Sequence, residues 1–391
     1  MGLWRLNPVK EAVRFFSRIS GGCRSNAIVL AGINLSQGVC DTPVPGVVLE
    51  GASHALSQRQ NSYTHYAGIG GLREALAEKY RTMYGIDVDP QQEIVVSAGA
   101  TGAMYCAFQA LLNPGDEVIV FEPYYGYHIS TLNALQAVPV FLSLTSPDWT
   151  FSEADLEAAV SSRTRAILIN TPGNPSGKVF TLAELQRIAD FAEEHDLFVF
   201  TDEIYEHFLY DGRRHHSPFA LPGMRKRTVL ISGFSKTFSV TGWRIGYAIS
   251  DARWAQAIGY FNDLVYVCAP SALQPGVAAG LATLDTSYYL SLSAEYGFKR
   301  NRFCRALGEA GLNAVLPQGA YYVLADVSHL PGSTTRDKAM HILRTTGVAS
   351  VPGSAFFRNE NDQHLVRFCY AKDDVVLDAA CERLMKLKEM D

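Results

Sequence analysis

The sequence has few cysteines, and their arrangement suggests neither a disulfide framework nor a zinc site. Seven cysteines stand at positions 23, 40, 106, 268, 304, 369 and 381, an odd number at wide spacing with no Cys-x-x-Cys pair. Secreted disulfide scaffolds use even sets, and zinc sites use closely paired ligands. The pattern favours buried free thiols in a reducing compartment, so we expect a cytoplasmic protein without a bound metal.

The sequence also lacks an excess of basic charge and long apolar runs. Its 39 Asp and Glu residues outnumber 34 Lys and Arg residues, for a formal net charge of −5. Nucleic acid is therefore not an expected partner. No apolar run approaches the ~18 residues of a membrane-spanning helix, so we expect a soluble chain with no membrane partner. A composition of 48% hydrophobic and 19% charged residues is that of a globular protein.

The N-terminal segment is basic and amphipathic. Five basic residues among the first 24 face a single acidic residue, Glu11, and apolar residues recur at helical spacing from Val9 to Phe16. Two interpretations fit this pattern. One is a mitochondrial presequence, and the other is an N-terminal helix packed on the body of the protein.

From about residue 94 onward, short apolar runs alternate with helical patterns. Two of the helices begin with capping boxes, Ser152-x-x-Asp155 and Thr181-x-x-Glu184. Alternation of this kind predicts an α/β domain in which helices cover a mostly parallel sheet. The seven predicted strands lie near residues 94–97, 117–121, 138–142, 165–169, 197–201, 228–232 and 245–249.

The length of the chain predicts one large and one smaller domain. A long helix is expected near residues 288–311, and a second α/β unit starts around Pro317 and includes an apolar strand over residues 364–371. We assign residues 47–285 to the large domain and residues 286–391 to a small C-terminal domain. Residues 1–46 form an N-terminal segment that joins the small domain.

Ligands of parallel sheets bind beyond the carboxyl ends of the strands, and the residues at those ends have suggestive chemistry. Gly99, Ala100 and Thr101 follow the first strand and open a helix, where backbone N–H groups hold a phosphate well. Asp202 ends the buried fifth strand, and a buried carboxylate needs a cationic partner. Each feature alone also fits an ordinary turn, helix cap or structural ion pair.

Lys236 follows the sixth strand among small and hydroxyl residues, and Arg244 stands eight positions later. A lysine becomes nucleophilic when burial or a nearby cation lowers its pKa, and an apolar strand end beside an arginine meets that need. With an aldehyde such a lysine forms a Schiff base, and pyridoxal phosphate is the common cofactor held in this way. A solvated loop lysine is the simpler interpretation of these two residues taken alone.

The run from Ile231 to Gly246 resembles the lysine-attachment motif of the class I and II aminotransferases, which ends in Arg-aliphatic-Gly as Arg244-Ile-Gly246 does. Further matches follow in family order along essentially the whole chain, so the resemblance implies a fold-type I enzyme with pyridoxal 5′-phosphate on Lys236. One departure stands out. Gly233 replaces a serine that the family often uses for the phosphate, with Ser232 one place earlier.

The resemblance implies a role for each matching residue. The phosphate is expected on Gly99, Ala100, Thr101, Ser235 and Arg244, with Tyr63 reaching it from the neighbouring subunit of a homodimer. The cofactor ring is expected to contact Tyr125 by stacking, Asn174 and Tyr205 at its phenolic oxygen, and Asp202 at its nitrogen. The substrate is expected beside Gly38, Tyr125 and Asn174, with its α-carboxylate on Arg367, an arginine inside an apolar strand that needs an anion.

The activity implied is ping-pong transamination, in which Lys236 moves the α-proton and a 2-oxo acid leaves before a second one enters. Tyr124-Tyr-Gly-Tyr127 and the run from Pro317 to Tyr321 look most like the branch of kynurenine, glutamine, methionine and aromatic aminotransferases, so we expect an aromatic or neutral L-amino acid as donor. Thr101 stands where some aspartate-preferring relatives carry a lysine. A carbon–sulfur β-lyase is the alternative, and an effector-sensing domain without enzymatic activity is a remoter one.

Overall fold

The computed structural model describes residues 32–358 and 363–390. The predicted N-terminal helix and Cys23 lie outside these residues. The six described cysteines are free thiols. Within the same residues, no single helix has the length and hydropathy of a membrane span, although α9 (Ala252–Tyr266) and the helical segment 271–283, bent by 118°, pass that test together.

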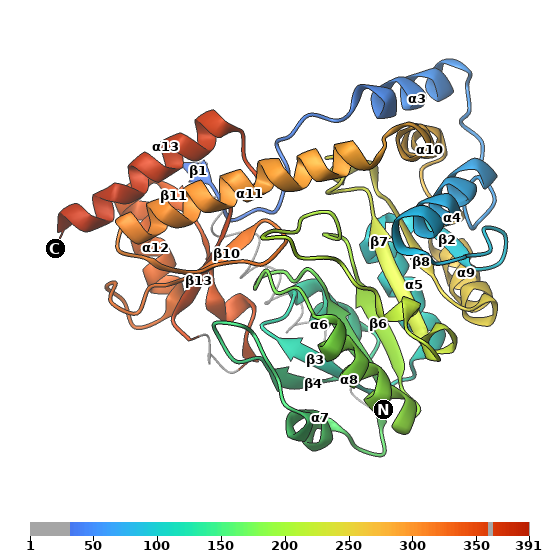
Figure 1. The fold of residues 1–391 in the computed structure, drawn as a ribbon, viewed down its shortest axis with the longest axis horizontal. Helices are drawn as coiled ribbons and strands as arrows, with labels where there is room; N and C mark the ends of the chain where they lie inside the picture. Colours follow the sequence, from blue (N-terminus) through green and yellow to red (C-terminus); the bar gives the residue numbers. More distant parts are fainter. Residues whose placement is uncertain (1–31, 359–362, 391) are drawn as a thin grey trace, which may run out of the picture.

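A seven-stranded sheet forms the centre of the larger part of the molecule (Figure 1), and all seven predicted strands are confirmed. Its spatial order is β2-β8-β7-β6-β5-β3-β4. Strand β8 runs antiparallel to both of its neighbours, and the other pairs are parallel. The strands are β2 (Ile94–Ala98), β3 (Glu117–Glu122), β4 (Val138–Ser143), β5 (Thr164–Asn170), β6 (Phe198–Asp202), β7 (Thr228–Gly233) and β8 (Ile245–Ile249).

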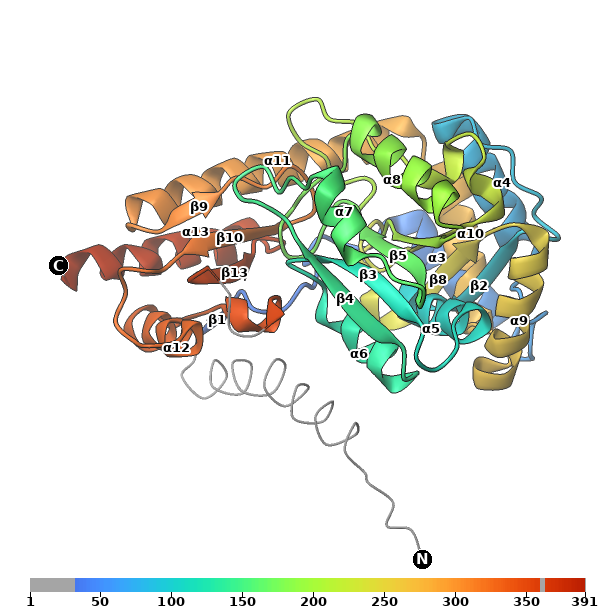
Figure 2. The ribbon, with the colours of Figure 1, turned by 90° about the horizontal axis from the view of Figure 1, so that it is seen from below.

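Helices cover both faces of this sheet (Figure 2), because successive strand side chains point to opposite faces and both faces are apolar. Val118 and Val120 pack with α5 (Gly99–Leu111), α6 (Gly126–Ala134) and α9 (Ala252–Tyr266). Ile119 and Phe121 face the other way, toward α8 (Leu182–Glu194). On that second face, α4 (Gly70–Tyr84), α3 (Gly46–Ser57) and α10 (Gln274–Thr283) cover the β2, β7 and β8 end.

Both predicted capping boxes are present. The Ser152 hydroxyl accepts from the Asp155 N–H at the start of α7 (Glu153–Ala159), and the Asp155 carboxylate accepts from the Ser152 N–H. Thr181 and Glu184 make the same reciprocal pair at the start of α8. Each box satisfies N–H groups that a helix start leaves unpaired.

A second, antiparallel sheet of four strands forms the smaller part, in the order β12-β13-β10-β9. The predicted long helix is α11 (Thr286–Glu309), which extends from the large sheet to this smaller part (Figure 1). β1 pairs with β11, so residues 33–34 join the C-terminal unit. The predicted domain boundaries stay predictions. The remaining elements are β1 (Ile33–Asn34), β9 (Asn313–Val315), β10 (Tyr322–Asp326), β11 (Val348–Ala349), β12 (Val351–Pro352), β13 (Leu365–Cys369), α12 (Thr335–Thr346), α13 (Asp374–Leu384) and short 3₁₀ turns at Pro218–Ala220, Met224–Lys226, Thr241–Trp243, Ser271–Leu273, Gly353–Ala355 and Met385–Met390.

A buried ionic network lies behind the segment that follows β6. Lys79 of α4 donates to Glu206 Oε1 at 2.6 Å, and the Tyr84 hydroxyl donates to the other oxygen of the same carboxylate. His215 Nε2 lies 2.7 Å from Glu203 Oε2. Burial alone would raise the pKa of Glu206, but Lys79, His207 and His215 together outweigh it and lower that pKa to about 2. The network therefore ties α4 to the chain between Asp202 and Glu206.

Replacing Lys79 by methionine removes the partner of a buried carboxylate. We expect Lys79→Met to lower the free energy of unfolding by about 3–5 kcal/mol, because an uncompensated buried charge is costly. Urea denaturation at neutral pH measures this change. The matched control is Arg81→Met on the same helix, whose ion pair with Glu78 leaves both side chains more than half exposed at 59% and 57%. Equal losses in the two variants would contradict the account.

Candidate active site

A cavity of about 630 Å³ lies between the two sheets, beyond the carboxyl ends of the parallel strands. That volume suits a small-molecule ligand. The residues that line it include most of the predicted site: Gly38, Ala100, Thr101, Tyr125, Asn174, Asp202, Tyr205, Ser235, Lys236, Arg244 and Arg367. Gly99 lies directly behind Arg244. Tyr63 does not line the cavity, and its side chain is 80% exposed.

Strand register brings these residues together. Asn170 at the end of β5 pairs with Asp202 at the end of β6, and Asp202 pairs with Ile231 near the end of β7. Since β8 is antiparallel, its first residue, Ile245, pairs with Ala98 at the end of β2. Arg244 therefore arrives at the same sheet edge as the N-terminus of α5.

The start of α5 forms a cradle for an anion. Ala98, which precedes the helix, has only a methyl side chain, so it cannot accept from the first-turn N–H groups of Gly99, Ala100 and Thr101. Arg244 lies against this turn, donating to the Thr241 carbonyl at 3.0 Å and the Ala98 carbonyl at 3.4 Å. Free N–H groups at a helix N-terminus beside a guanidinium fit a phosphate.

Glycine is required on both sides of this cradle. Gly99 has φ +79°, and a Cβ there would lie 2.2 Å from Arg244 Nη2. A Cβ on Gly246 would lie 2.2 Å from the Ala100 nitrogen. The backbone of β8 and the first turn of α5 thus approach each other too closely for any side chain.

The Lys236 amine lies in the cavity and donates to the Gly38 carbonyl at 2.7 Å. Burial lowers the pKa of Lys236 because it penalises the charged amine. The Cys40 and Cys369 thiols oppose this effect in part, and Arg244 and Arg367 add smaller effects that lower the pKa further. A larger fraction of neutral amine results. Neutral lysine is the nucleophile that Schiff-base chemistry needs.

Asp202 has a partner that sequence reasoning missed. His128 Nε2 lies 2.9 Å from Asp202 Oδ2, and both side chains are buried. An ionised carboxylate only accepts, so the imidazole donates. The other oxygen, Oδ1, accepts from the Ile204 N–H at 3.3 Å. In the sequence, the only feature that could have indicated His128 as a site residue is its place in the first turn of α6, the helix that follows β3.

Arg367 is poised for a carboxylate. Its guanidinium donates to Asn174 Oδ1 at 2.8 Å and to the Ser36 carbonyl at 2.6 Å. Its central carbon, Cζ, lies over two rings that were not predicted, 4.4 Å from the Tyr322 centroid and 4.9 Å from that of Phe356. Within residues 32–358 and 363–390, its Nε has no hydrogen-bond partner. A planar fork of this kind binds carboxylates in a bidentate manner.

The departure at Gly233 has a structural explanation. A Cβ at this position would lie 3.0 Å from Gly246 Cα, because β7 and β8 are close there. Ser232 does not substitute for the missing serine. Its hydroxyl donates to Glu206 Oε1 at 3.1 Å, within the buried network behind the site.

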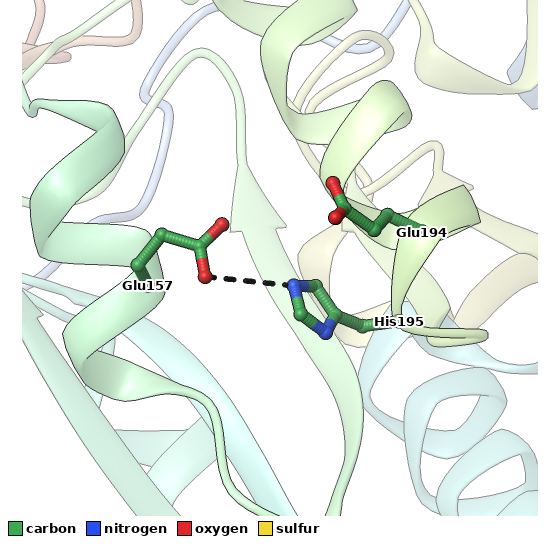
Figure 3. A group of neighbouring side chains, drawn as sticks. All are labelled: Glu157, Glu194 and His195. Carbon is green, nitrogen blue, oxygen red and sulfur yellow. Dashed lines mark ion pairs between the residues drawn. The ribbon is translucent and has the colours of Figure 1, made fainter.

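One trio of potential metal ligands, Glu157, Glu194 and His195, lies on α7 and at the end of α8 (Figure 3). Both glutamates are exposed, and His195 Nε2 is 3.7 Å from Glu157 Oε2. None of the three lines the cavity. This arrangement is an ordinary exposed acidic group beside a histidine.

These features of the cavity define a Schiff-base enzyme acting on amino acids. They are the Lys236 amine, the anion cradle at α5, the buried Asp202 and the Arg367 guanidinium that fits a carboxylate. A family model described as aminotransferase class I and II matches residues 31–384. Kynurenine–oxoglutarate transaminase 3 of Rattus norvegicus is 37% identical over 379 residues, covering 90% of this chain and 84% of the relative. A methionine aminotransferase of Escherichia coli has a TM-score of 0.90 at 33% identity, covering 94% of this chain and 96% of the other. N-succinyldiaminopimelate aminotransferase of Mycobacterium tuberculosis has a TM-score of 0.92 at 32% identity, covering 98% and 99%.

The chain belongs to the class I and II aminotransferase family. It is a fold-type I enzyme that transfers an amino group from an amino acid to a 2-oxo acid and uses pyridoxal phosphate held as a lysine Schiff base. The resemblance, the fold and the cofactor expected from the sequence are confirmed. The roles of the individual site residues stay predictions.

The phosphate cradle can be tested at Gly99. We expect Gly99→Ala to weaken binding of pyridoxal phosphate about 10- to 100-fold, the effect of one or two charge-assisted hydrogen bonds, because the new methyl group displaces Arg244. Pyridoxal without the phosphate should bind equally well to both proteins. Absorbance titration of the apoprotein measures both affinities.

The matched control is Gly85→Ala. Gly85 also has a positive φ, +67°, but a Cβ there meets nothing within 4 Å. The backbone strain of the two substitutions is therefore similar, and only Gly99→Ala disturbs the cradle. A similar loss of affinity in both variants would show that strain, not Arg244, is responsible.

The lowered pKa of Lys236 predicts a pH-dependent stability. The unfolded chain, with the ordinary value of 10.5, holds this proton more tightly than the folded apoprotein does. Stability gained through this group therefore rises with pH up to 10.5 and levels off above it. Lys236→Met lacks this gain, so the difference in unfolding free energy between the two apoproteins should change in favour of the wild type as pH rises toward 10.5. Parallel pH profiles would contradict the assignment.

Proposed function

We propose that this enzyme performs two half-reactions at one cavity, with an aromatic or neutral L-amino acid as donor and a 2-oxo acid as acceptor. The observation that carries the proposal is that Lys236, Asp202 and Arg367 line a single cavity. Lys236 accepts and donates a proton, Asp202 fits a ring nitrogen, and Arg367 fits an α-carboxylate. These are the three contacts that transamination needs.

Bound pyridoxal phosphate supplies an electron-withdrawing ring that acidifies the α-carbon of the amino acid. Asp202, held by His128, keeps a negative charge where the protonated ring nitrogen would lie. Tyr205 and Asn174 offer a hydroxyl and an amide to the ring oxygen, and Tyr125 offers a ring face. The Lys236 amine would accept the proton of the α-carbon as a general base and give it back as a general acid.

The substrate α-carboxylate would take the two donors of Arg367 that now contact Ser36 and Asn174. Asn174 can then turn its amide to the carboxylate or to the ring oxygen. The Ser36 carbonyl belongs to the segment 36–39, which covers the cavity and also receives the Lys236 hydrogen bond at Gly38. Substrate bound at Arg367 and cofactor bound at Lys236 would therefore each change a hydrogen bond of this segment.

The lining of the cavity supports the proposed donor class. Val39, Met104, Val351 and Phe356 give it apolar surface. Among the described residues, the lysines and arginines that line it are Lys236, Arg244 and Arg367, each already assigned. A second carboxylate on the donor would be buried without a cation, which is costly. Similar folds with different substrates show that architecture alone does not choose the donor.

A homodimer fits the position of Tyr63. The loop that carries it is tied to α9, because Asn262 donates to the Tyr66 carbonyl at 2.7 Å and the Tyr66 ring lies against Gly259. α9 presents three exposed apolar side chains, Tyr260, Leu264 and Val265. An exposed apolar helix face beside an exposed tyrosine supports burial against a second copy, where Tyr63 reaches the partner's phosphate.

Single amino acids added to the loaded enzyme without an acceptor test the proposed function. We expect aromatic amino acids, kynurenine, methionine or glutamine to convert the lysine-bound cofactor spectrum to that of the amine form with one equivalent of oxo acid. These donors should exceed aspartate at least about 10-fold in kcat/KM, since an unpaired buried carboxylate costs more than 1.4 kcal/mol. Lys236→Ala should not react.

Two other results would contradict the proposal. Reaction with aspartate alone would exclude the neutral or aromatic donor class. Catalytic release of ammonia and pyruvate from sulfur-substituted amino acids, with the lysine-bound spectrum unchanged, would establish the carbon–sulfur β-lyase instead.

A further inference from the structure

Two buried phenols meet at the boundary between the two sheets. The hydroxyls of Tyr205 and Tyr322 lie 2.9 Å apart. Tyr205 follows β6 of the large sheet, and Tyr322 begins β10 of the small one. Among the residues that the structure describes, each hydroxyl has the other as its hydrogen-bond partner and no further one. Both residues line the cavity.

The direction of this hydrogen bond follows from proton counting. A phenol has one proton to donate and can also accept. The proposed function requires Tyr205 to donate its proton to the phenolic oxygen of the cofactor. The bond between the two phenols can then be made only by the proton of Tyr322. A donor whose oxygen also accepts a hydrogen bond is polarised and becomes a stronger donor.

Tyr322 is held rigidly enough for this task. Its backbone pairs with Cys369 of β13, and its ring is covered by the guanidinium of Arg367 at 4.4 Å. The backbone of Gly38 lies against the hydroxyl end of this side chain, since a Cβ at this position would lie 1.8 Å from the Tyr322 hydroxyl oxygen. Tyr205 packs edge-on against the same ring at 5.7 Å. Neither hydroxyl can turn toward solvent without repacking the site.

We propose that Tyr322 is a positioning residue that directs the Tyr205 proton toward the phenolic oxygen of the bound cofactor and so lowers the proton affinity of the lysine–cofactor imine. This inference rests on the role proposed above for Tyr205. Because the two phenols come from different sheets, the relay is complete only when the sheets are as close as they are in this structure. The hydroxyl of Tyr322 thus couples the packing of the small sheet to the chemistry of Lys236.

The surroundings keep both phenols protonated and therefore able to donate. Burial raises the pKa of Tyr205, and the neighbouring phenols and Asp202 raise it further. Burial also raises the pKa of Tyr322, against a smaller opposite effect of Arg367. The cations that face the pair are Lys236 and Arg367. The acidic groups that face it are Asp202, Tyr125, Tyr321, Cys40 and Cys369.

The test is a pH titration of the absorbance of the loaded enzyme between about pH 5 and pH 10, without substrate. We expect Tyr322→Phe to move the midpoint of the imine transition upward by about 0.5–1 pH unit, the effect of one weakened neutral hydrogen bond. Tyr205→Phe should move it further. The double variant should match Tyr205→Phe alone, because Tyr322 acts only through Tyr205.

Tyr370→Phe is the matched control. Tyr370 is also a buried phenol, and its hydroxyl donates to another tyrosine, Tyr210, at 3.2 Å, but neither of these two lines the cavity. Its removal should leave the midpoint unchanged. A shift as large as that of Tyr322→Phe would attribute the effect to general loosening of the aromatic cluster and overturn the inference.

The remaining outcomes separate this inference from the proposed function. A wild-type midpoint in Tyr322→Phe, with Tyr205→Phe shifted, overturns the role of Tyr322 alone. A further shift in the double variant beyond Tyr205→Phe means that Tyr322 acts without Tyr205, and this also overturns it. If Tyr205→Phe titrates like the wild type, the proposed role of Tyr205 fails, and the relay fails with it.

Discussion

The site depends on one constraint, the register of the strands at the carboxyl edge of the large sheet. Parallel pairing of β5, β6 and β7 places Asn170, Asp202 and the approach to Lys236 side by side. The antiparallel strand β8 then returns Arg244 to the same edge, against the start of α5. A shift of one residue in any of these pairs would turn its catalytic side chain to the other face of the sheet.

Electrostatics supplies the second requirement. Arg244 and Arg367 bring two positive charges to the walls of one cavity, together with Lys236. Without anions this arrangement is unfavourable, and it lowers the pKa of the lysine in addition to the larger effect of burial. The same charges attract the phosphate and the carboxylate that the reaction needs. The charges that repel one another therefore also provide affinity for these anions and favour a neutral amine.

Much of this was predictable from the sequence, for identifiable reasons. Apolar runs bounded by turn residues located all seven strands, and the motif residues at their ends, such as Asp202 and Lys236, converge on the cavity. The contacts that pattern could not reveal join residues far apart in the chain. His128 and Asp202 are separated by 74 positions, and Tyr205 and Tyr322 by 117. The first contact is set by how α6 packs on the large sheet and the second by how the two sheets meet, and no local periodicity encodes either.

The central claim is that Lys236 carries the cofactor. Borohydride reduction of the enzyme loaded with pyridoxal phosphate, followed by peptide mass analysis, tests it most directly, because reduction makes the Schiff base permanent. The account predicts one labelled peptide, modified at Lys236. Labelling at Lys79, Lys178 or Lys372, three buried lysines, with Lys236 unmodified, would contradict it.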